Sequence, residues 1–289
     1  MNLILPAAAV CSFKLIAGAD NYGVMGNPVA HSKSPQIHAA FARQTGEPVV
    51  YQAIHVELDG FPAALDAFQE LGGKGLNITL PFKEAAWQAS HVRTGRAERS
   101  RAVNTLWFDQ SGRRHGDTTD GIGLIRDLSV NNIIQLAGKD VLLLGAGGAV
   151  RGILDPLFDQ GPAHVVIANR TVSRAGELAG LFADRGKLTA CDYEALRGQH
   201  FHVVINGTSA SLQGIVPPLP DDLLLPASCC YDLMYAATDT VFISWARAHG
   251  AATALDGIGM LVEQAAESFY IWRGIRPETR PVIEMLRKT

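Results

Sequence analysis

The chain has 289 residues, of which 47% are hydrophobic, and a formal net charge of -3 with acidic and basic residues mixed along the sequence. This length exceeds the size at which a single hydrophobic core stops growing, so two domains are expected. The weakly acidic balance argues against nucleic acid or an anionic membrane as a partner, and a small-molecule partner is expected instead.

The opening stretch, MNLILPAAAVCSF, is apolar, but no Lys or Arg precedes its apolar run and it is too short to span a bilayer. We interpret it as an extension and not as a signal peptide. The cysteines lack the C-x-x-C spacing of a zinc site and predict neither a metal site nor a disulfide framework, which fits a reducing cytoplasm. They are Cys11, Cys191, Cys229 and Cys230.

From Tyr22 onward, short apolar runs alternate with amphipathic stretches, which is typical of βα units around a mainly parallel sheet. Strands are predicted at YGVMG, VVYQAIHV, GLNITLP and AVNTLWFD, the last of which runs into a QSGR turn. A helix is predicted from Pro35 to Thr45, ending at Gly46, and another has Phe61, Leu65 and Phe68 on one stripe.

The segment GNPVAHSKSP, residues 26–35, allows two interpretations. Ser34 followed by Pro35 is typical of a helix start, with a hydroxyl cap before a ring whose φ is preset. Ser32 is not needed for that cap. An oxygen-rich ligand could therefore use both serines.

A second domain is predicted to begin near Asp120, because KDVLLLGAGGAVRGIL supplies a strand, a glycine turn and a helix in one unit. Further strands are predicted at HVVIANR, HVVIN and ASCCYDLMY, and the closing stretches are helical by spacing. The glycines Gly145, Gly147 and Gly148 would let a dinucleotide pyrophosphate approach backbone N–H groups at a helix N-terminus. A bare glycine turn without a nucleotide is the alternative.

The end of the second strand of this domain indicates which nucleotide binds. NAD-binding proteins place an acidic residue there for the ribose 2′-hydroxyl, whereas this chain has Asn169, Arg170 and Thr171, with Arg174 following. Guanidinium groups bind a 2′-phosphate through charge-assisted hydrogen bonds, so NADP is predicted. The alternative is that both arginines are solvated and Thr171 caps a helix.

Reduction of a ketone by hydride leaves an alkoxide that must be protonated, so a nicotinamide enzyme needs a proton donor near the carbonyl. Lys83 in NITLPFKEAA follows a strand end, where α/β sheets bind ligands, and Asp120 in GDTTDGIG begins a helix. Taken singly, Lys83 could be a solvated charge and Asp120 an N-cap.

Together these motifs resemble the bacterial shikimate dehydrogenases of the shikimate/quinate dehydrogenase family. The resemblance runs from YGVMGNPVAHSKSPQIH through GLNITLPFKEAA, AVNTL, GDTTDGIGLIRDL, LLLGAGGAVRGIL, ANRTVSRAGELA and YDLMY to DGIGMLVEQAA, and so covers nearly everything after residue 20. It implies an NADP-dependent oxidoreductase of aromatic amino-acid (chorismate) biosynthesis that reversibly reduces 3-dehydroshikimate to shikimate in the cytoplasm, as a monomer or homodimer.

The resemblance also assigns roles to residues. Ser32 and Ser34 would bind the carboxylate of shikimate, Lys83 would be the acid/base group, and Asp120 would hydrogen-bond the reacting side of the ring. The remaining substrate contacts would come from Thr79, Asn104, Tyr235 and Gln264. The NADP-binding positions would be Gly145, Ala146, Gly147, Gly148, Asn169, Arg170, Thr171, Arg174, Thr208 and Gly257.

The implied fold is α/β with two domains and the active site in the cleft between them. Residues 1–119 and 257–289 would form a substrate-binding domain with a mainly parallel sheet, and residues 120–256 a Rossmann-like NADP-binding domain. Three positions depart from the family pattern: Thr118 where Asn is common, Arg101 where Gly is usual, and Gly207 in place of the Ala of NATS. The alternatives are a quinate or aminoshikimate dehydrogenase, and a catalytically silent NADP-binding sensor.

Overall fold

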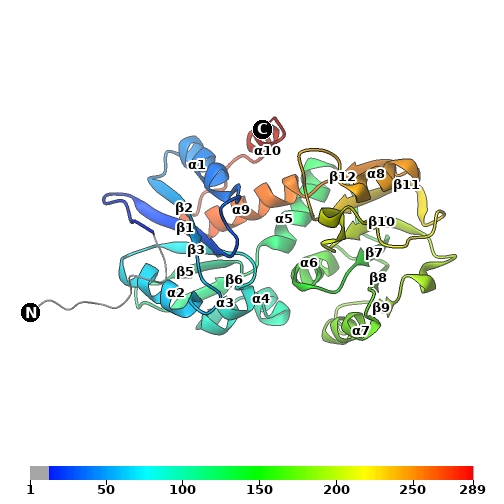
Figure 1. Ribbon diagram of the computed structural model, residues 1–289, viewed down its shortest axis with the longest axis horizontal. Coiled ribbons are helices and arrows are strands. Elements are labelled where there is room, and N and C mark those ends of the chain that lie inside the picture. The colour runs from blue at the N-terminus through cyan, green and yellow to red at the C-terminus, as the bar shows by residue number, and fades with distance from the viewer. Residues whose placement is uncertain (1–12, 289) are drawn as a thin grey trace, which may run out of the picture. The chain divides into compact units, whose positions relative to one another are not determined.

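The computed structural model describes residues 13–288 (Figure 1). Cys11 and nearly all of the predicted extension lie outside that range. The chain divides into two compact units. Unit 1 contains the described residues up to Thr119 together with Ala265–Glu284, and unit 2 contains Asp120–Gln264 with the described residues from Met285.

Unit 1 is built on a six-stranded sheet of order β2-β1-β3-β5-β6-β4. Pairs β1–β2, β1–β3 and β4–β6 are parallel, whereas β3–β5 and β5–β6 are antiparallel. Its elements are β1 (Asp20–Gly26), α1 (Ser34–Thr45), β2 (Val49–His55), α2 (Phe61–Glu70), β3 (Gly75–Ile78), α3 (Lys83–Ala89), β4 (Val92–Arg93), α4 (Gly95–Ser100), β5 (Thr105–Phe108) and β6 (Arg114–Asp117).

Apolar periodicity explains how the helices cover this sheet. The predicted stripe of α2, which includes Phe61, Leu65 and Phe68, is fully buried in a core shared with Ala86 of α3 and Ala97 of α4. On the opposite face, an aromatic cluster joins α1, β2 and the helix α9 (Ile258–Arg273). Its members are His38, Phe41, Tyr51, Phe269 and Trp272.

Unit 2 has a six-stranded, wholly parallel sheet of order β12-β11-β10-β7-β8-β9. Taken in chain order within the unit, this is the doubly wound order of dinucleotide-binding folds, with the switch point between β7 and β10. Its main elements are α5 (Asp120–Arg126), β7 (Asp140–Leu144), α6 (Gly148–Phe158), β8 (His164–Ala168), α7 (Val172–Leu181), β9 (Leu188–Cys191), β10 (Phe201–Asn206), β11 (Leu224–Asp232), α8 (Val241–Ala248) and β12 (Thr253–Leu255). The predicted Rossmann-like α/β fold is confirmed.

Short one-turn elements complete the two units. A π-helix follows α5 directly at Asp127–Asn131, and 3-10 turns lie at Glu194–Leu196 and Ala210–Gln213. Helix α9 belongs to unit 2 up to Gln264 and to unit 1 from Ala265, and α10 (Arg280–Leu286) follows it. None of the helices in residues 13–288 is long and apolar enough to cross a membrane.

The sequence pattern missed β4, β6, α3 and α4. Strand β4 has two residues, and β6 reads RHGD, which has no apolar alternation. Strand β4 forms because it pairs with β6, and β6 also pairs with β5. Tertiary pairing therefore overrides a sequence that has no strand periodicity.

Two departures from the family pattern have local causes. Arg101 is the exposed C-cap of α4 and adopts φ 50°, a left-handed conformation that glycine adopts more easily. Gly207 packs against α6, because a Cβ on this residue would overlap the Cγ2 methyl of the fully buried Val150. The missing methyl at position 207 thus makes room for the valine side chain.

This packing predicts that Gly207→Ala destabilises the protein by about 1–3 kcal/mol, the usual cost of overpacking. In a Val150→Ala background the same change should cost less than about 0.5 kcal/mol, because the clashing methyl is gone. Urea unfolding of the four proteins of this double-mutant cycle measures the coupling. Gly180→Ala in α7, where a Cβ meets nothing within 4 Å, is the matched control. Equal costs in both backgrounds would contradict the predicted clash.

Candidate active site

The predicted substrate residues of unit 1 gather at one edge of its sheet. Parallel strands β1 and β3 end at the same edge, and β5 begins there because it runs antiparallel to β3. Ser32 and Ser34 follow β1, Thr79 and Lys83 follow β3, and Asn104 precedes β5. Backbone hydrogen bonds tie these loops together, from Thr79 N to Met25 O at 2.9 Å and from Ile78 N to Asn104 O at 2.8 Å.

The interpretation of Ser34 as a helix cap is wrong. Helix α1 begins at Ser34 itself, so the N-cap position falls on Lys33, whose side chain makes no capping hydrogen bond. The backbone N–H of Ser34 donates instead to Oγ of Ser32 at 3.3 Å, which brings the two serines together. Burial raises the pKa of the Tyr51 phenol, and the nearby hydroxyl of the buried Ser34 partly offsets that rise. The pair is thus held by contacts beyond the helix start.

A buried hydrogen-bond network runs from Tyr51, which lies near Ser34, to Asn104. Tyr51 donates its O–H to Oδ1 of Asn77 at 2.7 Å. Nδ2 of Asn77 then donates to the carbonyl of Asn104 at 3.1 Å and to Oγ of Ser268, from helix α9, at 2.9 Å. Such a network rigidifies a site because each group left unpaired inside the protein would be costly.

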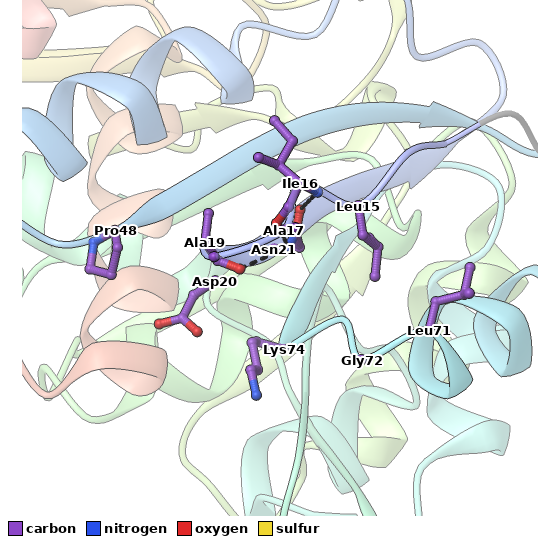
Figure 2. Close-up of a pocket in the computed structure, with 11 residues that line it drawn as sticks. Leu15, Ile16, Ala17, Ala19, Asp20, Asn21, Pro48, Leu71, Gly72 and Lys74 are labelled. Atoms are coloured by element: carbon purple, nitrogen blue, oxygen red, sulfur yellow. Dashed lines mark hydrogen bonds between the residues drawn. The ribbon is translucent and has the colours of Figure 1, made fainter.

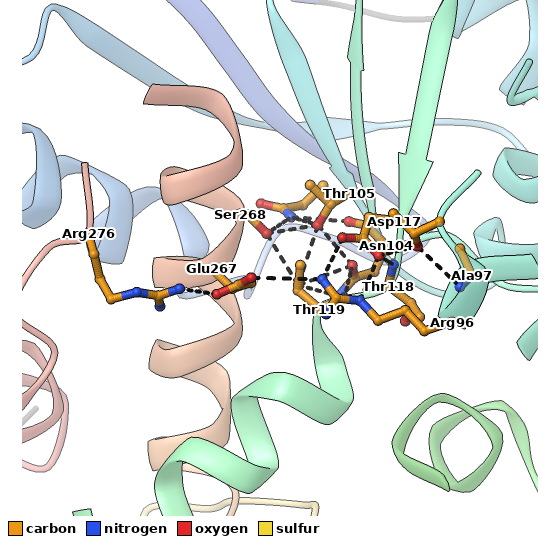
Figure 3. Close-up of polar contacts among 12 residues, drawn as sticks. Arg96, Ala97, Asn104, Thr105, Asp117, Thr118, Thr119, Glu267, Ser268 and Arg276 are labelled. Atoms are coloured by element: carbon orange, nitrogen blue, oxygen red, sulfur yellow. Dashed lines mark hydrogen bonds and ion pairs between the residues drawn. The ribbon is translucent and has the colours of Figure 1, made fainter. Parts of the chain in front are cut away.

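The orientation of the Asn104 amide is fixed by its neighbours (Figure 3). The backbone N–H of Thr119, which can only donate, points at Oδ1 of Asn104 at 2.9 Å, and the hydroxyl of Thr105 donates to the same oxygen at 2.8 Å. Nδ2 of Asn104 donates to Oγ1 of Thr119 at 3.0 Å. This arrangement presets the amide before any ligand arrives.

Charged side chains flank the Asn104 amide and its neighbours (Figure 3). The guanidinium of Arg96 binds the buried carboxylate of Asp117 through Nε at 2.8 Å and Nη2 at 2.5 Å. Asp117 also accepts from the N–H of Thr118 at 2.7 Å, and Glu267 pairs with Arg276. Thr118 is one of the three positions that depart from the family pattern. Its hydroxyl is buried and has no hydrogen-bond partner in residues 13–288.

The two predicted reacting groups belong to different units. Lys83 is the first residue of α3, and its carbonyl accepts from the N–H of Val103 at 2.9 Å, which places the start of α3 beside the loop that carries Asn104. Asp120 is the first residue of α5 and of unit 2. Their pairing stays a prediction.

The predicted cofactor loop lies at the switch point of unit 2. Gly145 adopts φ 99°, and a Cβ there would lie 3.1 Å from the Cγ2 methyl of Thr208. The loops after β7 and β10 are therefore in contact, and Gly207 N donates to Leu144 O at 2.9 Å. A Cβ on Gly147 or Gly148 would meet nothing within 4 Å, so the N-terminus of α6 is open to a ligand.

The residues predicted to select NADP follow β8. Asn169 donates Nδ2 to the carbonyl of Thr171 at 2.8 Å, which shapes the turn. Arg170 and Arg174 are exposed, and neither pairs with a carboxylate in the described part of the chain. Thr171 occupies the N-cap position of α7, as the alternative interpretation predicted, although its side chain makes no capping hydrogen bond.

The other predicted residues of unit 2 surround the start of α9. Gly257 donates its N–H to Met234 O at 3.1 Å, and a Cβ on it would overlap the carbonyl of Leu233. Tyr235 is half-buried three residues past β11, and burial raises the pKa of its phenol. Gln264 donates Nε2 to Leu261 O at 2.9 Å, one turn back in α9.

Sequence reasoning missed Tyr51, Asn77 and Ser268, which form the buried network around Asn104. The sequence separations explain the miss, because the bond from Asn77 to Ser268 spans 191 residues and the bond from Tyr51 to Asn77 spans 26. A polar residue within the apolar strand GLNI was the available signal, since a buried Asn needs partners.

A separate hollow of about 540 Å³ lies at the opposite edge of the unit 1 sheet (Figure 2). Its lining comes from segments that precede strands, such as Ala19 before β1, Pro48 before β2 and Lys74 before β3. Ligands of α/β sheets bind at the carboxyl ends of the strands, and none of the predicted site residues lines this hollow.

Three family models match separate parts of the chain. The shikimate dehydrogenase substrate binding domain matches residues 24–106, the shikimate / quinate 5-dehydrogenase model matches residues 127–216, and the shikimate 5'-dehydrogenase C-terminal domain matches residues 257–287. The shikimate dehydrogenase (NADP(+)) of Alkalilimnicola ehrlichii is 60% identical over 268 residues, which cover 93% of this chain and 98% of the relative. The chain belongs to the shikimate dehydrogenase family.

Solved structures agree with this membership. The Ael1 enzyme from Pseudomonas putida has a TM-score of 0.88 and 46% identity, covering 93% of this chain and 98% of that one. Shikimate 5-dehydrogenase from Thermus thermophilus, in complex with NADP(H) and shikimate, has a TM-score of 0.83 and 32% identity, covering 93% and 99%. The resemblance inferred from the motifs is confirmed.

His38, beneath the serine pair, generates a pH prediction. It is fully buried and stacks on Tyr51 with ring centroids 4.1 Å apart, and burial lowers its pKa to about 3. Because the folded pKa lies below the unfolded value of about 6.5, stability is complete above about pH 6.5 and is lost as the pH falls toward about 3. The loss approaches about 1.4 kcal/mol per pH unit.

The His38→Phe variant should lack this dependence, because it keeps an aromatic ring and cannot bind the proton. The free energy of unfolding, measured by urea titration at several pH values from about 7 to about 4, gives the difference in slope. His55→Phe, at an exposed histidine, is the control. Parallel slopes for the wild type and His38→Phe would show that His38 does not resist protonation.

Proposed function

We propose that this protein catalyses the reversible, NADP-dependent reduction of 3-dehydroshikimate to shikimate, with the predicted residues in the roles given above. One observation carries the proposal: the serine pair, Lys83 and Asn104 lie on contacting loops at one sheet edge, in a chain whose other unit has the NADP-type loop and arginines. Membership of the family and 60% identity to an NADP-dependent shikimate dehydrogenase support the same reaction.

The proposed substrate site uses neutral donors and one cation. The hydroxyls of Ser32 and Ser34 hold the carboxylate, and Thr79 and Asn104 hold ring hydroxyls from the same loops. Tyr235 and Gln264 add contacts from unit 2. The residues of unit 1 lie on loops at the ends of its strands, which favours a single orientation of the ring carbonyl.

Proton transfer is the task of Lys83 in this mechanism. NADPH held by the unit 2 loops would supply the hydride that reduces the carbonyl carbon. The Lys83 ammonium gives a proton to the carbonyl oxygen, which has taken up the electron pair of the former C=O π-bond, so that the alcohol forms. Asp120 orients the hydroxyl and the ammonium. In the oxidation direction, Lys83 takes the proton back.

Cofactor selection rests on the loops of unit 2. The open N-terminus of α6 after Gly147 would hold the pyrophosphate, and Ala146, Gly148, Thr208 and Gly257 are the further residues that would contact the cofactor. Asn169 and Thr171 shape the loop on which Arg170 and Arg174 bind the 2′-phosphate. An acidic residue at this place would repel that phosphate, so the loop favours NADP over NAD.

We place the enzyme in a reducing cytoplasm with a small molecule as its partner, as a monomer or homodimer. Cys191, Cys229 and Cys230 are free thiols, and burial raises the pKa of each, with that of Cys229 near 12. Free thiols that form no disulfide fit a reducing compartment.

The function is tested by initial rates of NADPH or NADH formation, with shikimate and quinate each offered with NADP and NAD. We expect the highest kcat/KM for shikimate with NADP. Faster turnover of quinate, or a preference for NAD, would assign the chain to a different branch of the family. Cofactor binding without turnover of either acid would indicate an NADP-binding sensor.

The role of Lys83 predicts that Lys83→Met lowers kcat by about 10²–10⁴-fold, the usual contribution of general acid-base catalysis, while KM changes by only a few-fold. Lys74→Met is the matched control, because Lys74 is exposed at the opposite edge of the same sheet and should keep wild-type rates. A Lys83→Met enzyme with near-normal kcat would remove Lys83 from the chemistry.

A further inference from the structure

We propose that Asp127 and Tyr231 form a buried lock that positions Gln264 on α9 relative to Asp120 on α5. This inference rests on the proposed function, because it assigns positioning residues to the same reaction. All four residues belong to unit 2, and neither Asp127 nor Tyr231 is among the residues assigned to substrate or cofactor.

The lock is a chain of hydrogen bonds from the end of α5 to the start of α9. Asp127, 3% exposed, is the first residue of the π-helix that follows α5. The fully buried Tyr231 donates its O–H to Oδ2 of Asp127 at 2.7 Å. The phenol oxygen in turn accepts the N–H of Met260 at 3.1 Å. First-turn N–H groups have no partner in their own helix, so Tyr231 supplies one for α9.

A second polar tie joins the same segments beside Gln264. Glu263 is fully buried, and its carboxylate accepts from Nε of Arg126 at 2.9 Å and from Nδ2 of Asn131 at 3.0 Å. The same amide nitrogen of Asn131 donates to Oδ1 of Asp127 at 2.9 Å. The buried carboxylate of Glu263 on α9 therefore depends on donors from α5 and the π-helix, which resists movement of α9 along its axis.

Two glycines allow close packing around α5 and α9. A Cβ on Gly259, in the first turn of α9, would overlap the carboxylate of Asp127. A Cβ on Gly123 of α5 would lie 2.7 Å from Gln264 N and 2.8 Å from Gln264 Cβ. The backbone of helix α5, which begins at Asp120, thus packs directly against Gln264.

Breaking the lock would change the geometry of two residues proposed to bind substrate. Removal of the Tyr231 hydroxyl would leave both the Met260 N–H and an oxygen of Asp127 without a partner, so the first turn of α9 would shift. Gln264, further along α9, would move relative to Asp120. The glycine loop and the arginines after β8 make no part of this lock, so cofactor affinity should be spared.

The test compares Tyr231→Phe with the wild type. We expect kcat/KM for shikimate to fall about tenfold or more, mainly through KM, while the Kd of NADP from fluorescence titration stays within about twofold. Tyr270→Phe, on the exposed part of the same helix, is the control and should match the wild type. Unchanged shikimate kinetics in Tyr231→Phe, or an equal loss of NADP affinity, would overturn the lock.

A second variant tests the contact between α5 and α9 without removing a polar group. Gly123→Ala should separate α5 from α9 and raise the KM for shikimate several-fold, whereas Gly176→Ala in α7, where a Cβ meets nothing, should not. If Tyr231→Phe does not fold, the KM of Gly123→Ala for shikimate tests the lock instead.

Turnover of quinate in place of shikimate by the wild type would refute the proposed function alone, and the variants would then be compared on quinate. Were neither acid turned over, the same variants would be compared by calorimetric Kd for shikimate.

Discussion

Parallel pairing of β1 with β3 and of β7 with β10 is the constraint on which the loop arrangement within each unit depends. Parallel strands bring their carboxyl ends to one edge, so loops distant in sequence must meet there. In unit 1 this edge collects the serine pair, Lys83 and Asn104, and in unit 2 it brings the glycine loop against Thr208. The side chains in those loops then decide the chemistry.

Buried polar networks turn these two edges into defined sites. In unit 1, Asn77 and Ser268 join strand β3 to α9, and the Asn104 amide receives donors that fix its orientation. In unit 2, Asp127 and Tyr231 do the same for α5 and α9. Buried polar groups are tolerated when every member is paired, and the result is rigidity.

Helix α9 connects these two networks within one element. Its first half carries Met260 and Gln264 in unit 2, and its second half carries Ser268 in unit 1. A helix transmits displacement along its axis because its backbone hydrogen bonds are continuous. Substitutions that shift the start of α9 should therefore move Gln264 within unit 2 without touching the glycine loop after β7.

The sequence by itself determined the features that depend on contiguous residues: the strand, glycine turn and helix of unit 2, the arginines after β8, and the stripe of α2. Only the tertiary structure decided that Ser34 is not a cap, that β4 and β6 are strands, and that Val150 requires a glycine at position 207. It also revealed the bond between Asn77 and Ser268. The reason is physical, because local patterns follow backbone periodicity, whereas these contacts join atoms from segments far apart in the chain and leave no periodic trace.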